Sequence, residues 1–221
     1  MGIISVEQVD HLFWLGRYTE RVYTTLKVYS ESFDRMIDES EDSYQGYCDS
    51  LDIPNIYESK EDFLKRYPFD NTVPDSIISN LSRAYDNAIV LRETIGSEAL
   101  SYIQMSIYAM NNASLSDAPL IDLQQIMDDL LAFWGLVDDQ IDSKKIRNII
   151  KAGKRIERID LYARLEVDKK RLEREVQRMI PRVLRSGMKY DEVSLSKISS
   201  LINDTNLDYE KIILNVEKIV M

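Results

Sequence analysis

The sequence predicts an all-α fold, a bundle of about six to eight helices. Seven Gly and five Pro among 221 residues are too few to supply the turns of a β-sandwich or β-barrel. Apolar residues instead recur every three or four positions over most of the chain, which is the spacing of helices with one buried face. A chain of this length can bury a sizeable core, and we expect a single domain over residues 1–221.

The first expected helix is long and is followed by an irregular segment. Ser5 and Gln8 have the spacing of a capping box, and the apolar spacing continues from there into the thirties. The periodicity fails over 41–75, where three of the five prolines lie among Asp, Ser, Asn and Tyr. We expect an irregular excursion over 41–75, with one helical turn near 61–67.

Helical spacing returns after this excursion. Two helical segments are expected from about 75 to 110, joined or kinked near Gly96. Pro119 suits the first position of a helix that reaches about residue 140. Two shorter helices are expected in the tail, at about 194–202 and 208–220.

The segment after residue 142 carries a large share of the positive charge. Ser143 caps a helix expected to continue beyond Leu165, to bend or restart at Pro181 and to end at Gly187. Residues 143–186 hold 15 Lys or Arg and six Asp or Glu, a net +9 in a chain of net charge −10. The rest of the chain therefore carries −19.

The charge distribution excludes some functions and leaves two interpretations open. An acidic chain disfavours a general nucleic-acid partner. The basic segment is either neutralised by acidic helices of the same chain, such as residues 31–62, or is a site for phosphate, carboxylate or an acidic partner. No stretch approaches the length of a membrane span and no secretory signal is recognisable, so we expect a cytoplasmic protein.

One short pattern occurs twice. The run LGRYTERV at 15–22 reappears as AGKRIERI at 152–159, with a glycine, a base and then Glu-Arg in both copies. Glycine inside a helix costs about 1 kcal/mol relative to alanine, and close approach of another backbone is a common compensation. We expect the two helices to cross at Gly16 and Gly153, with Glu-Arg pairs bridging between them across a pseudo-twofold axis.

The two copies allow a structural and a functional interpretation. In the structural one, the Glu-Arg pairs form a buried ionic network that holds two helices in register. In the functional one, basic residues of both copies and of the middle of the chain form a pocket for a phosphate or carboxylate, with Glu20 and Glu157 orienting the guanidinium groups and Glu98 available as a base. The basic residues of that pocket are Arg17, Arg21, Arg92, Lys154 and Arg158.

These segments resemble the bacterial alpha-E domain family, an all-helical domain with an ER motif and no established reaction. The resemblance covers LFWLGRYTER, SRAYDNAIVLRETIGSEAL and FWGLVDDQIDSKKIRNIIKAGKRIER. In the middle block the family pattern falls on Arg83, Asn87, Ala88, Arg92, Glu93, Ser97 and Glu98. The chain departs from that pattern soon after the Ser-Glu pair, where the family usually has Trp and this chain has Ala99 and Leu100, and at Lys154, where the family usually has Arg.

The resemblance implies a role beside other enzymes. Alpha-E domains are encoded near, or fused to, ATP-grasp ligases, transglutaminase-like peptidases and amidohydrolase-type enzymes in proposed peptide-modifying systems. The implied function is a non-catalytic binding or scaffold component, with such a ligase or peptidase as protein partner. The alternative is an enzyme that acts at the Arg/Glu-lined anion pocket on a peptide or phosphorylated substrate.

Other motifs give weaker expectations. Asp138, Asp139 and Asp142 spell a DDxxD run, but no second acidic motif with the spacing of a prenyl synthase accompanies it. With one histidine, one cysteine and no glycine-rich phosphate loop, we expect neither a metal nor a cofactor in this chain. Tyrosines in the excursion either form a partner surface or cover the core beneath them; these are Tyr44, Tyr47, Tyr57 and Tyr67.

Overall fold

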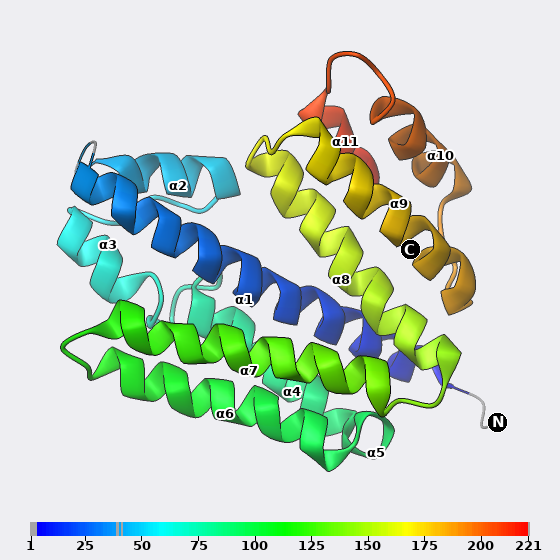
Figure 1. The fold of residues 1–221 in the computed structure, drawn as a ribbon, viewed down its shortest axis with the longest axis horizontal. Coiled ribbons are helices and arrows are strands. Elements are labelled where there is room, and N and C mark those ends of the chain that lie inside the picture. Colours follow the sequence, from blue (N-terminus) through cyan, green and yellow to red (C-terminus); the bar gives the residue numbers. More distant parts are fainter. Residues whose placement is uncertain (1–3, 39, 41, 221) are drawn as a thin grey trace. The chain divides into compact units, whose positions relative to one another are not determined.

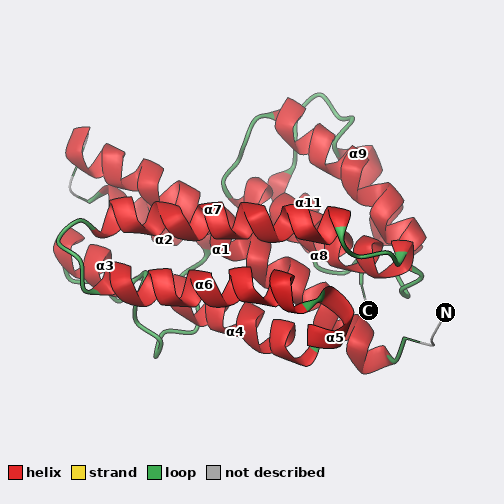
Figure 2. Ribbon diagram, turned by 60° about the horizontal axis from the view of Figure 1, so that its bottom comes forward, coloured by secondary structure: helices red, strands yellow, loops and turns green. Residues whose placement is uncertain are grey.

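The computed structural model describes residues 4–38, 40 and 42–220. Over these residues the protein consists of helices and loops (Figure 2), with one isolated antiparallel bridge between Tyr190 and Val220. The all-α prediction is confirmed, but the expected number of helices is wrong, because the described residues form eleven. The chain forms two compact units, 1–20 with 141–221 and 21–140, and helix α1 (Val6–Asp38) contributes residues to both.

The unit of residues 21–140 contains a pair of long helices. Helix α6 (Ser97–Ser114) lies beside α7 (Pro119–Asp139) in both views (Figures 1 and 2), and α4 (Ile77–Val90) packs on α6. The short α5 (Arg92–Ile95) precedes α6. Gly96 between them has φ of +86°, a conformation that glycine adopts without a steric cost. The predicted break at Gly96 is therefore confirmed.

The predicted irregular excursion contains more helix than expected. The turn expected near 61–67 is present as α3 (Lys60–Arg66), whose N-cap Ser59 accepts a hydrogen bond from the Asp62 amide. The expectation for residues 43–51 is wrong, because they form α2 (Ser43–Leu51). This sequence includes Gly46 and few strong helix formers, so its helix depends on packing rather than on local propensity.

That packing comes from an aromatic cluster within residues 21–140. Phe63 is fully buried and stacks on Tyr67, with ring centroids 5.2 Å apart. The Tyr47 hydroxyl donates to the Thr25 carbonyl at 3.2 Å and lies 3.0 Å from the Tyr67 hydroxyl. The four tyrosines of the excursion are all buried, so they cover the core and are not a partner surface; they are Tyr44, Tyr47, Tyr57 and Tyr67.

The unit of residues 1–20 and 141–221 is built around the start of α1 and four later helices. These are α8 (Lys144–Arg164), α9 (Lys169–Ser186), α10 (Glu192–Leu201) and α11 (Tyr209–Val216), with α8 packed on both α9 and α11. Ser143 caps α8 as predicted, accepting a hydrogen bond from the Ile146 amide. Helix α9 runs back alongside α8 (Figure 1).

The prediction that a single helix continues beyond Leu165 is wrong. Helix α8 ends at Arg164, and the new helix α9 begins at Lys169. Glu166 has φ of +47°, which turns the chain, and the Asp168 side chain then accepts a hydrogen bond from the Arg171 amide as the new N-cap. Helix α9 continues through Pro181 instead of restarting there. Gly187, with φ of +68°, follows its last residue as predicted.

Candidate functional site

The two Glu-Arg segments meet at their glycines. A Cβ atom added to Gly16 of α1 would lie 2.1 Å from the Ile150 carbonyl oxygen of α8, and one added to Gly153 would lie 2.1 Å from the Phe13 carbonyl oxygen. Both distances are far below van der Waals contact, so only glycine allows the two backbones to come this close. The predicted crossing at Gly16 and Gly153 is therefore confirmed.

Two ion pairs bridge this contact reciprocally. The Arg17 Nε donates to Glu157 Oε2 at 2.6 Å, and the Arg158 Nε donates to Glu20 Oε1 at 2.5 Å. Neither glutamate side chain has any exposed surface, and the arginines are 13% and 16% exposed. We call this arrangement of Gly16, Gly153 and the two pairs the Glu-Arg crossing. Its arginines therefore bind the other segment's glutamate rather than standing open to a ligand.

Aromatic residues on both sides of Arg17 in α1 also lie close to it. The Arg17 guanidinium lies 5.0 Å from the centre of the Trp14 ring, and Trp14 stacks on Tyr18 at 5.2 Å. An arginine over an indole face gains a favourable cation–π interaction. The guanidinium of Arg17 is thus held by a carboxylate and an aromatic ring within the same unit.

Lys154 is the base of the second copy and lies beside the crossing. Its Nζ is 4.0 Å from Glu20 Oε2, and its side chain is 13% exposed. Burial lowers the pKa of Lys154 to about 7, and the positive charges of Arg158, Arg155 and Lys151 act in the same direction, against Glu20. The ammonium group of Lys154 therefore loses its proton far more readily than that of an exposed lysine.

A second ionic cluster lies between α8 and α9. The Glu175 side chain is 1% exposed and forms ion pairs with four arginines. Its oxygens lie 3.2 Å from Arg178 Nη1, 3.7 Å from Arg158 Nη1 and 3.8 Å from Arg174 Nε, and Arg155 forms a close hydrogen bond as well. We call these five residues the Glu175 cluster.

Sequence reasoning did not single out four of these five residues. The net charge of 143–186 pointed to the segment, but the position of Glu175 among its bases did not stand out. Arg174 and Arg178 are four residues apart on α9 with Glu175 beside one of them, and this spacing places both arginines on one face. Two arginines on one helix face beside a single glutamate are therefore the sequence pattern that indicates this cluster.

The candidate residues of the middle block bind near neighbours in the unit of 21–140. Arg83 Nη1 donates to the Pro74 carbonyl at 2.8 Å, Arg92 Nε donates to Ser97 Oγ at 3.2 Å, and Glu98 Oε2 accepts from Gln140 Nε2 at 2.7 Å. Asn87 Nδ2 donates to the Arg83 carbonyl at 2.7 Å. Arg92, Glu93 and Glu98 are exposed, while Arg21, Arg83 and Asn87 are partly buried. A role for these residues in an anion pocket stays a prediction.

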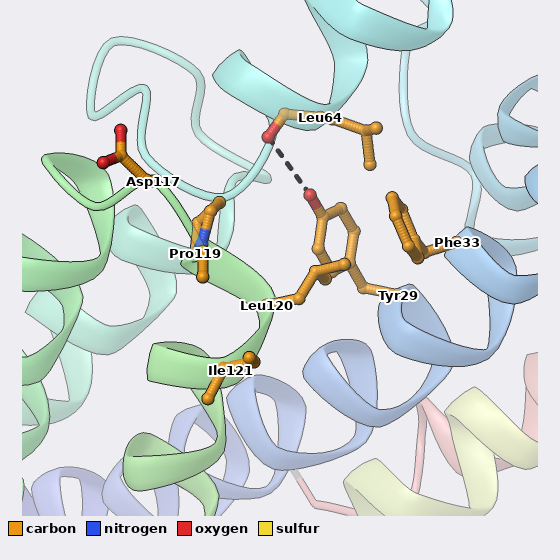
Figure 3. Close-up of a pocket in the computed structure, with 8 residues that line it drawn as sticks. Tyr29, Phe33, Leu64, Asp117, Pro119, Leu120 and Ile121 are labelled. Atoms are coloured by element: carbon orange, nitrogen blue, oxygen red, sulfur yellow. Dashed lines mark hydrogen bonds between the residues drawn. The ribbon is translucent and has the colours of Figure 1, made fainter.

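A cavity of about 310 Å³ lies in the unit of 21–140. Figure 3 shows Tyr29 and Phe33 of α1 on one side and the first turn of α7 on the other, with the Tyr29 hydroxyl donating to the Leu64 carbonyl at 3.1 Å. The walls are mainly apolar. The full lining is Tyr29, Phe33, Leu64, Asp117, Ala118, Pro119, Leu120 and Ile121.

Cys48 and possible metal ligands are the remaining candidates for a functional site. Burial raises the pKa of the Cys48 thiol to about 11, with a further contribution from Asp49, so this cysteine is a poor nucleophile at neutral pH. Within residues 4–38, 40 and 42–220, no group of three or more His, Cys, Asp or Glu side chains is placed to hold a metal ion. No helix in that part of the chain is long and apolar enough to cross a membrane.

Comparison with known proteins identifies the family. Residues 7–198 match the model of the Alpha-E family, described as a predicted alpha-helical domain with a conserved ER motif. No curated protein and no solved structure matches the chain. The matched range contains both Glu-Arg copies, at 20–21 and 157–158, and the chain belongs to the Alpha-E family.

Proposed function

We propose that this protein is a non-catalytic binding or scaffold component of a peptide-synthesis or peptide-modification system. Its partner in this proposal is an ATP-grasp-type ligase or a transglutaminase-like peptidase, as the family resemblance implies. The proposal treats residues 1–221 as one Alpha-E domain whose two Glu-Arg helices are an internal repeat. It expects the protein to act in the cytoplasm.

The observation that carries the proposal is the complete burial of Glu20 and Glu157. A carboxylate that acts as a catalytic acid or base must reach the proton it transfers. Here each carboxylate instead accepts a hydrogen bond from an arginine of the other segment. Removing one partner from such a buried pair costs about 3–5 kcal/mol. These Glu-Arg pairs therefore support a role in holding α1 on α8.

The partner contact is proposed at the cavity of Figure 3. Ile121 at its wall is 75% exposed, and Leu115 in the preceding loop is 89% exposed. Exposed apolar side chains around an apolar hollow favour insertion of an apolar side chain from a partner. Asp117 is exposed beside them, which favours a basic residue next to that side chain on the partner.

Co-purification with the products of neighbouring genes tests this proposal. We expect the full chain to form a stable complex with a ligase or peptidase encoded beside it, detected by size-exclusion chromatography with light scattering. Ile121→Asp should weaken the complex at least tenfold. Leu184→Asp is the matched control, because Leu184 is 53% exposed on α9 outside this unit, and it should change the affinity less than twofold. A chain that stays monomeric with every such protein would refute the proposal.

A second candidate function is an enzyme acting on a peptide or phosphorylated substrate. The observation that favours it is Lys154, whose pKa of about 7 would let its amine accept a proton at neutral pH. The substrate's anionic group would bind near Lys154, within the unit of residues 1–20 and 141–221. Lys154→Met should then abolish turnover of such a substrate while leaving the complex with the partner intact, and an unchanged turnover would exclude this mechanism.

A further inference from the structure

The positive charges of the Glu175 cluster exceed its negative charge. Arg155, Arg174 and Arg178 each form an ion pair with Glu175, and among the described residues no other carboxylate lies within ion-pair distance of them. The fourth arginine, Arg158, also pairs with Glu20. Three guanidinium groups therefore share one carboxylate, so these four side chains together carry a net charge of +2.

The surplus faces solvent on one side. The side chains of Arg174 and Arg178 are 57% and 52% exposed, whereas Arg155 is 20% exposed and Glu175 only 1%. Glu175 is thus buried among the guanidinium groups, while Arg174 and Arg178 present more than half of their side-chain surface to solvent. We propose that the Glu175 cluster binds the phosphoryl group of a small phosphorylated molecule.

A phosphoryl group matches this cluster in charge and shape. A phosphate monoester carries about −1.5 to −2 charges at neutral pH and presents three acceptor oxygens at one point. Planar guanidinium groups bind such oxygens in pairs. An acidic peptide spreads the same charge over separate carboxylates. Such a peptide fits a long basic surface better than a compact cluster of four arginines around the Glu175 carboxylate.

The residues next to the cluster add to its positive potential. Arg182 Nη1 donates to Asn148 Oδ1 at 3.0 Å, which places it across from α8. Burial, together with the positive charges of Arg182 and Arg155, lowers the pKa of Lys151 to about 8. A bound dianion would relieve this repulsion among cations, so the surroundings favour anion binding as well.

This site is independent of the proposed partner function. Of the cluster's four arginines only Arg158 also belongs to the Glu-Arg crossing, and none of the four lines the cavity of Figure 3. Failure to find a partner enzyme would therefore leave the phosphoryl site untouched. Loss of phosphoryl binding would equally leave the partner proposal standing.

Isothermal titration of the full chain with pyrophosphate at low ionic strength tests the site. Arg174→Gln/Arg178→Gln should weaken pyrophosphate binding at least tenfold. Lys170→Gln/Lys189→Gln is the matched control, because it removes the same charge from two exposed lysines of the same unit, and it should weaken binding less than twofold. Equal losses in both double variants, or no binding by the wild-type chain, would overturn the proposal.

Further titrations identify the source of the phosphoryl group. Equal affinity for ATP and tripolyphosphate would show that the phosphate chain alone is recognised, and tighter binding of ATP would point to a nucleotide. A Glu-rich peptide of the same charge should bind at least tenfold more weakly than pyrophosphate. Tighter binding of that peptide would assign the cluster to an acidic protein and overturn the phosphoryl proposal.

Glu175→Gln should change pyrophosphate binding in the direction opposite to the arginine variants. Removing the carboxylate that competes for the guanidinium groups should tighten pyrophosphate binding severalfold, provided that circular dichroism shows native helix content. If the variant unfolds, pyrophosphate should restore its helix content at concentrations that leave the wild-type spectrum unchanged. Weaker binding by a folded variant, or no restoration of an unfolded one, would contradict the proposal.

Discussion

The Glu-Arg crossing and the Glu175 cluster use the same side chains in different proportions. In the crossing, two carboxylates pair with two arginines, and both glutamates are fully buried. In the Glu175 cluster, one buried carboxylate serves four arginines, two of which are more than half exposed. The first arrangement balances its charge internally, which suits a structural contact, whereas the second has charge left for a ligand.

The largest expected effect comes from breaking the balance of the crossing. Glu157→Leu leaves Arg17 at 13% exposure without its carboxylate, so the free energy of unfolding should fall by about 3–5 kcal/mol. Arg17→Leu/Glu157→Leu removes both charges and should recover much of that loss, since paired replacement by apolar residues is often nearly neutral. Urea unfolding followed by circular dichroism measures both. A double variant as unstable as Glu157→Leu would argue against a balanced pair.

The next effect concerns the backbone contact that brings the pairs together. Gly16→Ala places a Cβ where the Ile150 carbonyl oxygen already lies, so α1 and α8 must separate, at a cost of about 1–3 kcal/mol or more. Gly135→Ala is the matched control, because a Cβ there meets nothing within 4 Å. That change should stabilise α7 by roughly 0.5–1 kcal/mol. Thermal unfolding should therefore show that Gly16→Ala lowers the stability and Gly135→Ala raises it. Stability changes of the same sign in the two variants would contradict the close backbone contact at Gly16.

Much of the crossing could be predicted from the sequence because its determinants are local. A glycine followed by a base and then Glu-Arg occurs twice at helical spacing, and Gly16 and Gly153 mark a close contact whatever the rest of the chain does. The N-cap at Ser143 and the break between helices at Gly96 could be predicted for the same reason, because a single residue determines each of them. Local sequence carries this information directly.

The features that could not be predicted depend on residues far apart in the chain. Helix α2 is held by Tyr47 and Phe63 from different segments, with ring centroids 5.4 Å apart, and its own sequence has little helical preference. The Glu175 cluster exists because Glu166 turns the chain and brings α9 back along α8. A single residue with positive φ decides this turn, and non-glycine residues give little warning of it.

A smaller effect links Lys154 to pH. Its pKa is lowered to about 7 in the folded protein, and the unfolded chain has the ordinary lysine value, so the unfolded state binds more protons between these two pH values. Stability from this group therefore rises with pH above about 7 and reaches its full value near the unfolded pKa. Lys154→Met should raise the free energy of unfolding at pH 7, by up to about 1.4 kcal/mol for each unit by which the pKa is lowered.

The pH dependence of that gain distinguishes burial from other causes. The advantage of Lys154→Met over the wild type should shrink as the pH rises from 7 to 10, in urea unfolding series at fixed ionic strength. Lys170→Met is the control, because Lys170 is exposed on α9 and should show no such trend. A constant advantage across this range would mean that the lysine is not buried as a charge.

The smallest expected effect separates the two ionic groups most sharply. Arg178 belongs to the group with surplus charge and is 52% exposed, so Arg178→Gln should change the free energy of unfolding by less than about 1 kcal/mol. Arg17→Gln removes the partner of Glu157 from the balanced group and should cost about 3 kcal/mol or more. Both variants lose one positive charge, so net charge cannot explain a difference between them. Similar losses in the two variants would show that the Glu175 cluster is as structural as the crossing, because a surplus cation kept for a ligand should be dispensable to the fold.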